Sequence, residues 1–184
     1  QWGNRCLFIR TIIFHWIFFW FINSFINSFD YSNENLSSCP NDFSCNDIHI
    51  EERIQISIIT DSDTICDLLS TLECEKISLN GYSYLNLHDN CNLFNFVVGN
   101  NEKQTSNDVR TVECLLNKWC IDYVSSKILK IYLPSYSKNI FAKIYCKLSE
   151  NLDIYSSYLG EDNSIYIETS NNKRAINCIK SILR

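Results

Sequence analysis

Residues 54–72 read IQISIITDSDTICDLLSTL and contain the pattern that decides the fold. The first five residues alternate apolar and polar side chains, which is typical of a strand with one buried face. Asp61 and Ser62 follow, and both residue types favour the N-cap of a helix. Beyond them, apolar side chains recur at helical spacing at Ile65, Leu68, Leu69 and Leu72. The stretch predicts a strand followed directly by a capped amphipathic helix.

Two more strands and a second helix are predicted after this stretch. Residues 77–87 and 93–98 have strand composition, and the polar residues 88–92 between them predict a turn. Ser106 is the expected N-cap of the next helix. The inward side chains of that helix follow at spacings of three and four residues, at Val109, Val112, Leu116, Trp119 and Tyr123. Residues 50–126 therefore form one predicted β-α-β-β-α unit.

The same order of elements recurs in residues 127–184, without a repeat of residue identity. The predicted elements are a strand at 129–133 closed by Pro134, a helix at 140–148, strands at 152–158 and 164–168, and a last helix capped by Asn171 or Asn172. We therefore predict an α+β fold of two small β-α-β-β-α units, KH-like or ferredoxin-like, with helices on one face of antiparallel sheet. A ferredoxin-like β-α-β-β-α-β domain over 53–133, with 134–184 as an appendage, is equally allowed.

The N-terminal residues 1–29 are strongly hydrophobic and carry Arg5 and Arg10 but no acidic residue. This pattern predicts an N-terminal hydrophobic helix that serves as a signal peptide or membrane anchor. A helix buried in a larger assembly and a fragment or translation artefact are the alternatives. The polar residues 30–49 predict a linker. Asn35 begins a lone glycosylation sequon, which would fit export across a membrane.

Charge is unevenly distributed along the chain. The net charge of -5 combines +2 in residues 1–29, -11 in residues 30–126 and +4 in residues 127–184. The overall acidity excludes a simple polycation that wraps nucleic acid. It does not exclude nucleic-acid contact by the basic second unit.

The second unit resembles a K-homology (KH) RNA-binding domain. Residues 129–134 (LKIYLP) are similar to the opening strand of that family. Residues 164–170 (SIYIETS), which lead into 173–183 (KRAINCIKSIL), are similar to its closing strand and helix. The family clamps nucleotide backbone with a GXXG loop, whereas residues 135–143 (SYSKNIFAK) contain no glycine. The resemblance implies a degenerate KH-like unit that contacts single-stranded RNA or a ribonucleoprotein.

The expected contact residues of this unit are lysines and an arginine for phosphates and tyrosines for base stacking. They are Lys138, Lys143, Lys147, Tyr136, Tyr145, Lys173, Lys180 and Arg184. A solvated helix face and a surface for an acidic protein partner are the alternative interpretations of the same cations.

The sequence predicts no enzyme, no metal site and no cofactor. It contains no CxxC pair and no glycine-rich phosphate loop. The only histidines outside the hydrophobic segment are His49 and His88, and neither lies in a pattern that indicates a nucleophile–base pair. Most of the ten cysteines are expected to be reduced, although a Cys146–Cys178 bridge between two packed helices is compatible with the pattern.

Two functions follow from these observations. The first is a non-enzymatic RNA-binding or ribonucleoprotein-associated module that uses the basic unit at 127–184. The second is a membrane-anchored or secreted α+β domain, partly stabilised by disulfides, that attaches through residues 7–29 and acts on a protein partner. The two differ in cellular compartment, and the sequence leaves the localisation open.

Overall fold

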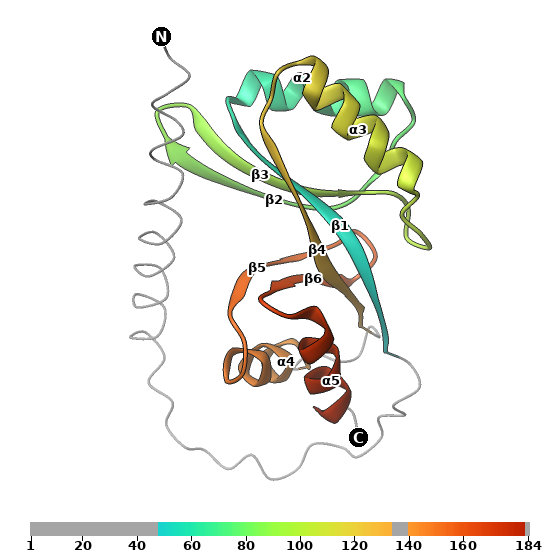
Figure 1. Ribbon diagram of the computed structural model, residues 1–184, viewed down its shortest axis with the longest axis vertical. Coiled ribbons are helices and arrows are strands. Elements are labelled where there is room, and N and C mark those ends of the chain that lie inside the picture. The colour runs from blue at the N-terminus through green and yellow to red at the C-terminus, as the bar shows by residue number, and fades with distance from the viewer. Residues whose placement is uncertain (1–47, 134–139, 183–184) are drawn as a thin grey trace. The chain divides into compact units, whose positions relative to one another are not determined.

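A computed structural model describes residues 48–133 and 140–182 (Figure 1). The predicted hydrophobic helix at 1–29 and nearly all of the linker lie outside the described residues. Within them the chain forms six strands and four helices in an α+β fold. In chain order these are β1 (His49–Thr60), α2 (Ser62–Cys74), β2 (Leu79–His88), β3 (Cys91–Val98), α3 (Ser106–Lys118), β4 (Tyr123–Tyr132), α4 (Ile140–Ser149), β5 (Ile154–Leu159), β6 (Ser164–Thr169) and α5 (Asn172–Ile182).

All six strands belong to one antiparallel sheet with the order β2-β3-β1-β4-β6-β5. β3 lies between β1 and β2 and is antiparallel to both, so β1 and β2 are parallel. β1 lies between β3 and β4 and is antiparallel to both, so β3 and β4 are parallel. The elements from β1 to β4 therefore form a ferredoxin-like β-α-β-β-α-β arrangement. β4 then begins a second β-α-β-β-α sequence, in which β6 lies between β4 and β5.

The first half (β1, α2, β2, β3 and α3) and the second half (β4, α4, β5, β6 and α5) are related by an approximate twofold axis. The pair Ile54↔Lys127, in the β1–β4 ladder, lies on this axis. The pair Ile56↔Phe96 in the first half corresponds to Leu129↔Ile167 in the second. The repeat predicted from element order is thus also a repeat of strand register.

Both halves bury their apolar side chains between the sheet and the helices. In the first half Ile56 and Phe96 pack with Leu116 of α3, and in the second half Ile131 packs with Ile179 of α5. Alternate β1 residues contribute to both clusters, so all four helices cover the same face of the sheet. Figure 1 shows α2 and α3 over one part of this sheet and α4 and α5 over the other.

The boundaries of α3 differ from the prediction at both ends. Its N-cap is Thr105, whose hydroxyl accepts a hydrogen bond from the Asp108 amide at 3.1 Å, and not Ser106. The helix ends at Lys118, because Cys120 adopts a left-handed φ of 56° and the Ile121 amide donates back to the Leu116 carbonyl at 2.9 Å. This is a Schellman ending without glycine. It allows β4 to begin at Tyr123, six residues before the predicted strand.

Candidate functional site

The face of the sheet that carries no helix is also buried at its centre. We call it the helix-free face. Val97, Ile128 and Tyr166 on it have no exposed surface, and Tyr158 packs against them with its ring stacked on that of Tyr166 at 5.3 Å. The sheet is curled so that its two edge strands meet, and Gly81 pairs with Gly160 in an isolated antiparallel bridge. This contact encloses the centre of the helix-free face.

A small group of residues makes this contact between the sheet edges. The Glu161 amide donates to the Asn80 carbonyl at 3.1 Å, and the Tyr166 hydroxyl donates to the Asn80 side-chain oxygen. A Cβ on Gly81 would lie 2.6 Å from Cε2 of Tyr166, and a Cβ on Gly160 would lie 2.8 Å from the same atom. Glycine is required at both positions because the ring occupies the space of a side chain. We call these five residues the edge closure.

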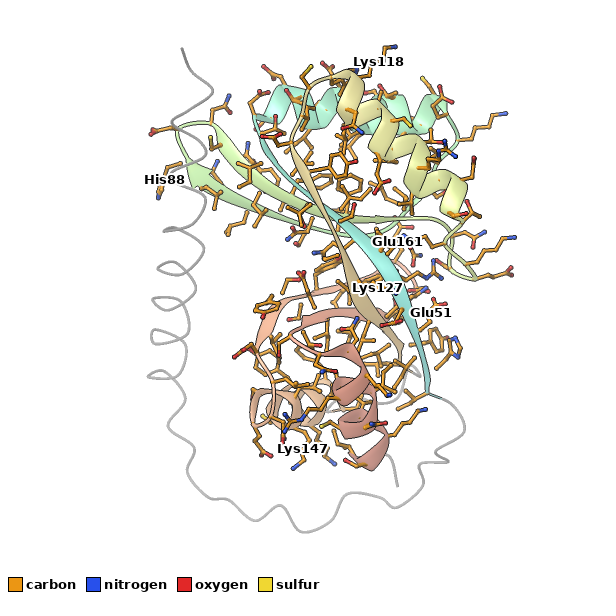
Figure 2. The ribbon with its side chains drawn as sticks, viewed as in Figure 1. Glu51, His88, Lys118, Lys127, Lys147 and Glu161 are labelled. Atoms are coloured by element: carbon orange, nitrogen blue, oxygen red, sulfur yellow. The ribbon has the colours of Figure 1, made fainter. Side chains whose placement is uncertain are left out.

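A buried cluster of charges lies beside the edge closure. Lys130 forms an ion pair with Asp162 at 2.7 Å, and the Arg53 Nε donates to Glu51 at 2.8 Å. Arg53 and Lys130 are 2% and 3% exposed, so both cations depend on these partners. Burial alone would raise the pKa of Asp162, but hydrogen bonds from Lys130 and Ser164 and the Lys130 charge lower it below its usual value. Figure 2 labels Glu51 on β1 and Glu161 in the turn after β5.

The loop between β3 and α3 supplies the remaining acceptors of this cluster. Arg53 donates to the carbonyls of Asn100 and Asn101 at 3.1 and 3.3 Å, and Lys130 donates to the Asn101 carbonyl at 2.9 Å. The Asn80 side-chain amide also donates to the Asn101 side chain at 2.6 Å. The loop of the first half is thereby tied to both halves through two buried cations.

A second hydrogen-bond network, with Glu168 as its acidic member, occupies another part of the helix-free face. The Gln55 side chain donates to Glu168 at 3.0 Å and accepts from the Tyr158 hydroxyl at 2.8 Å. Ser156 also donates to Glu168, at 3.2 Å. The hydroxyl oxygen of Ser126, which lies opposite Gln55 in the β1–β4 ladder, is buried and has no partner among the described residues. These groups are mostly satisfied by each other and leave little free hydrogen-bonding capacity for a ligand.

The second half carries an open polar depression with a volume of about 500 Å³. It lies where α4 leads into β5 and where β6 leads into α5. An arginine and two acidic residues line it together with serine and asparagine side chains. The lining residues are Ser149, Glu150, Asn151, Leu152, Asp153, Ser170, Asn171 and Arg174.

The charges in the depression are not all neutralised by neighbours. Glu150 accepts from Lys147 at 2.9 Å, an exposed pair. Within residues 48–133 and 140–182, the Asp153 carboxylate and the Arg174 guanidinium have no ion-pair partner. The backbone around them is fixed, because the Ser170 amide donates to the Asp153 carbonyl at 3.0 Å and Asn171 caps α5 through the Arg174 amide at 2.9 Å. An anionic and a cationic group are therefore held on a rigid frame with their charged ends available.

The equivalent place in the first half is built differently. The Gly99 amide donates to the Ser78 carbonyl at 2.9 Å, which corresponds to the Ser170–Asp153 bond of the second half. In the second half the cap of α5 follows at once, whereas residues 100–104 intervene before the Thr105 cap of α3. Those extra residues form the loop that binds Arg53 and Lys130. The open depression with its arginine is thus a feature of the second half.

The expected nucleic-acid contact residues are divided between the helices of the second half and segments outside the described residues. Tyr136, Lys138 and Arg184 lie outside. Lys143, Tyr145 and Lys147 are exposed on α4, and Lys173 and Lys180 are exposed on α5, which packs against α4. The Tyr145 ring lies 5.9 Å from that of Phe141, and Lys147 is the partner of Glu150. The locations of these residues do not show whether they contact RNA, so their expected roles stay predictions.

The sequence-based search missed the residues that distinguish this structure. Lys130 alternates with apolar residues, and Arg53 precedes the predicted strand at Ile54, so both resemble solvent-facing positions although both are buried. Arg174 contributed to the net charge of +4 but was not selected as a binding residue. Cys146 and Cys178 carry free thiols, so the possible bridge between them is not formed. Within the described residues no group of histidine, cysteine and acidic side chains is arranged to hold a metal ion.

No protein-family model and no curated protein matches the chain. Solved structures do match its fold. The structure of protein BT0572 from Bacteroides thetaiotaomicron has a TM-score of 0.55 and 16% identity, over 73% of this chain and 90% of that chain. The regulatory subunit of aspartate kinase from Thermus flavus has a TM-score of 0.52 and 11% identity, over 74% of this chain and 97% of that chain.

These matches correct the sequence-based interpretation. The fold is that of BT0572 and of the aspartate kinase regulatory subunit, so the resemblance of residues 127–184 to a KH domain is wrong. The physical reason is that the strand at 129–133 is the C-terminal part of β4, which pairs along its length with β1 of the first half. The two halves share one sheet, and the second half is not a separate KH-like unit.

The functions and partners drawn from the sequence are corrected with it. RNA binding and ribonucleoprotein association relied on the KH resemblance, and the neighbouring structures support neither these nor the membrane-anchored or secreted alternative. Among residues 48–133 and 140–182, no helix is both long and apolar enough to cross a membrane. The segment 7–29 proposed to attach to a membrane lies outside these residues.

Proposed function

We propose that this chain is a non-catalytic regulatory domain that binds a small zwitterionic molecule, with free amino acids as the ligand class. The observation that carries the proposal is the likeness to a regulatory subunit of aspartate kinase over 97% of that subunit. The arrangement is of the ACT-like kind, in which such domains bind amino acids and partner catalytic domains. A protein partner with its own active site is therefore part of the proposal.

The depression on the second half supports this ligand class. Its volume of about 500 Å³ lies within the range that suits small-molecule sites. Arg174 offers a planar pair of donors to a carboxylate, and Asp153 offers acceptors to an ammonium group. A zwitterion satisfies both kinds of group at once, whereas an anion or a cation alone leaves one of them unmatched.

A thermal-shift screen of the full chain against the twenty proteinogenic amino acids tests the proposal. We expect one or a few of them to raise the Tm in a concentration-dependent way, because a ligand that binds only the folded state stabilises it. The variant Arg174→Gln should lose this response. Arg110→Gln is the matched control, because Arg110 is exposed on α3 in the first half, away from the depression. No response to any amino acid, or an unchanged response in Arg174→Gln, would contradict the proposal.

A further inference from the structure

The contact between the two sheet edges differs from the rest of the sheet. Neighbouring strands elsewhere are joined by ladders, and β1 and β4 alone pair over ten successive positions, from His49↔Tyr132 to Ile58↔Tyr123. β2 and the residue that follows β5 form one isolated bridge, Gly81↔Gly160, with the Glu161–Asn80 hydrogen bond beside it. The edge closure is therefore a short contact between strands that are otherwise held by their own hairpins.

The interactions of the edge closure are polar or aromatic and lie apart from the two helix-side cores. Asn80 accepts from the Glu161 amide with its carbonyl and from the Tyr166 hydroxyl with its side chain. The apolar clusters of both halves lie on the opposite face of the sheet and contain none of these residues. Separation of the edges therefore breaks no contact within those two clusters or in the β1–β4 ladder.

Separation would uncover a surface that is now enclosed. The Tyr166 ring of the closure stacks on the ring of Tyr158, and the pair Lys130–Asp162 lies beside the closure. The loop residue Asn101 connects the two regions, since it accepts from both Lys130 and Asn80. Of these groups, Tyr166 and Lys130 are almost completely buried on the helix-free face.

We propose that the edge closure is a latch that opens and closes as a unit while the rest of the sheet stays folded. Its opening exposes the tyrosine pair and releases the β3–α3 loop from Asn80. β5 borders both the latch, at Gly160, and the depression, at Asp153, so one strand of six residues adjoins both places. The proposal does not depend on the identity of a ligand or on the regulatory function.

Hydrogen exchange of the full chain, followed for single amides by NMR, tests the latch. The Glu161 amide reports on the closure, because its hydrogen-bond acceptor is the Asn80 carbonyl across the gap. The amides of the β1–β4 ladder report on global unfolding. We expect the Glu161 amide to exchange faster than the ladder amides and with a weaker dependence on denaturant, because the opening exposes less surface than global unfolding. Exchange of both only through the same denaturant-sensitive opening would overturn the proposal.

A pair of tyrosine variants separates the latch from general packing. Tyr166→Phe removes the hydroxyl bonded to Asn80 and keeps the ring, so exchange at Glu161 should become about tenfold faster while the ladder amides keep their rates. Tyr158→Phe is the matched control, because its hydroxyl bonds to Gln55 and not to the closure. Equal acceleration at Glu161 and in the ladder, or the same effect from both variants, would show that no separate latch exists.

Discussion

The two halves of the sheet are alike on the helix-covered face and different on the helix-free face. On the helix-covered face the halves are equivalent, with Ile56↔Phe96 in one and Leu129↔Ile167 in the other. On the helix-free face the same register places Asn95 opposite Ser83, bonded at 3.0 Å, but Tyr166 opposite Tyr158, stacked at 5.3 Å. The helix-covered face therefore maintains the fold that the halves share, whereas the helix-free face distinguishes them.

The largest effects are expected where the halves are equivalent. Phe96→Ala should cost about 3–5 kcal/mol and Ile167→Ala about 2–5 kcal/mol of unfolding free energy, because each empties a fully buried site. Since both residues pack on one continuous sheet, each variant should shift a single transition in guanidinium denaturation. Leu159→Ala is the control, at a side chain that is 73% exposed. Two transitions, of which one variant moves only one, would show that the halves fold independently.

The next effect is expected where the halves differ most. Arg53 and Ser126 occupy equivalent positions about the twofold axis, but Arg53 is a buried, paired cation, whereas the Ser126 hydroxyl has no partner in the part of the chain that the structure describes. Arg53→Met should cost about 3 kcal/mol, because it leaves Glu51 without its closest cation. Ser126→Ala should change stability by less than about 0.5 kcal/mol. Urea denaturation of both variants measures the difference, and equal losses would refute the contrast.

Smaller and similar effects are expected at the helix caps. Thr105 caps α3, and Asn171 caps α5. Alanine at either position should lower stability by about 1 kcal/mol, because one amide at the first turn loses its acceptor. Chemical denaturation checks the values. If Asn171→Ala were neutral while Thr105→Ala was not, the two helix starts would not be energetically equivalent.

The smallest effect is expected in the acid range. Because the pKa of Asp162 is lowered in the folded state, its carboxylate stabilises the fold above the unfolded-state pKa of about 3.9, and that contribution is lost as the pH falls through the lowered value. Wild type should therefore lose more stability between about pH 5 and pH 2 than Asp162→Asn does. Denaturation curves across that range measure the gap. Parallel pH profiles would mean that the Lys130–Asp162 pair makes no difference.

The helix-covered face was predictable because burial there follows local periodicity. The spacing of Val112 and Leu116 places both on the inner side of α3, and the alternation at Ile56 and Ile58 identifies the buried side of β1. Asp61 was also predictable as a cap, and its hydrogen bonds from Thr64 lower its pKa. These features depend on neighbours only a few residues away.

The helix-free face was not predictable in this way. Arg53 and Lys130 resemble exposed residues in the sequence. They are enclosed by the loop that contains Asn101 and by the curl of the sheet toward Gly81 and Gly160. The start of β4 was not predictable because Tyr123 continues the helical spacing of α3. The left-handed backbone at Cys120 ends that helix before Tyr123. The depression likewise depends on residues that are separated in the sequence. Asp153, just before β5, and Arg174, in α5, line it together.

The most direct test of the regulatory proposal is NMR mapping of the full chain with the amino acid that gives the largest thermal shift. We expect amide shift changes at Asp153, Ser170 and Arg174 and none at the equivalent Ser78 and Gly99 of the first half. Changes confined to the first half, or changes produced equally by a short single-stranded RNA, would contradict it.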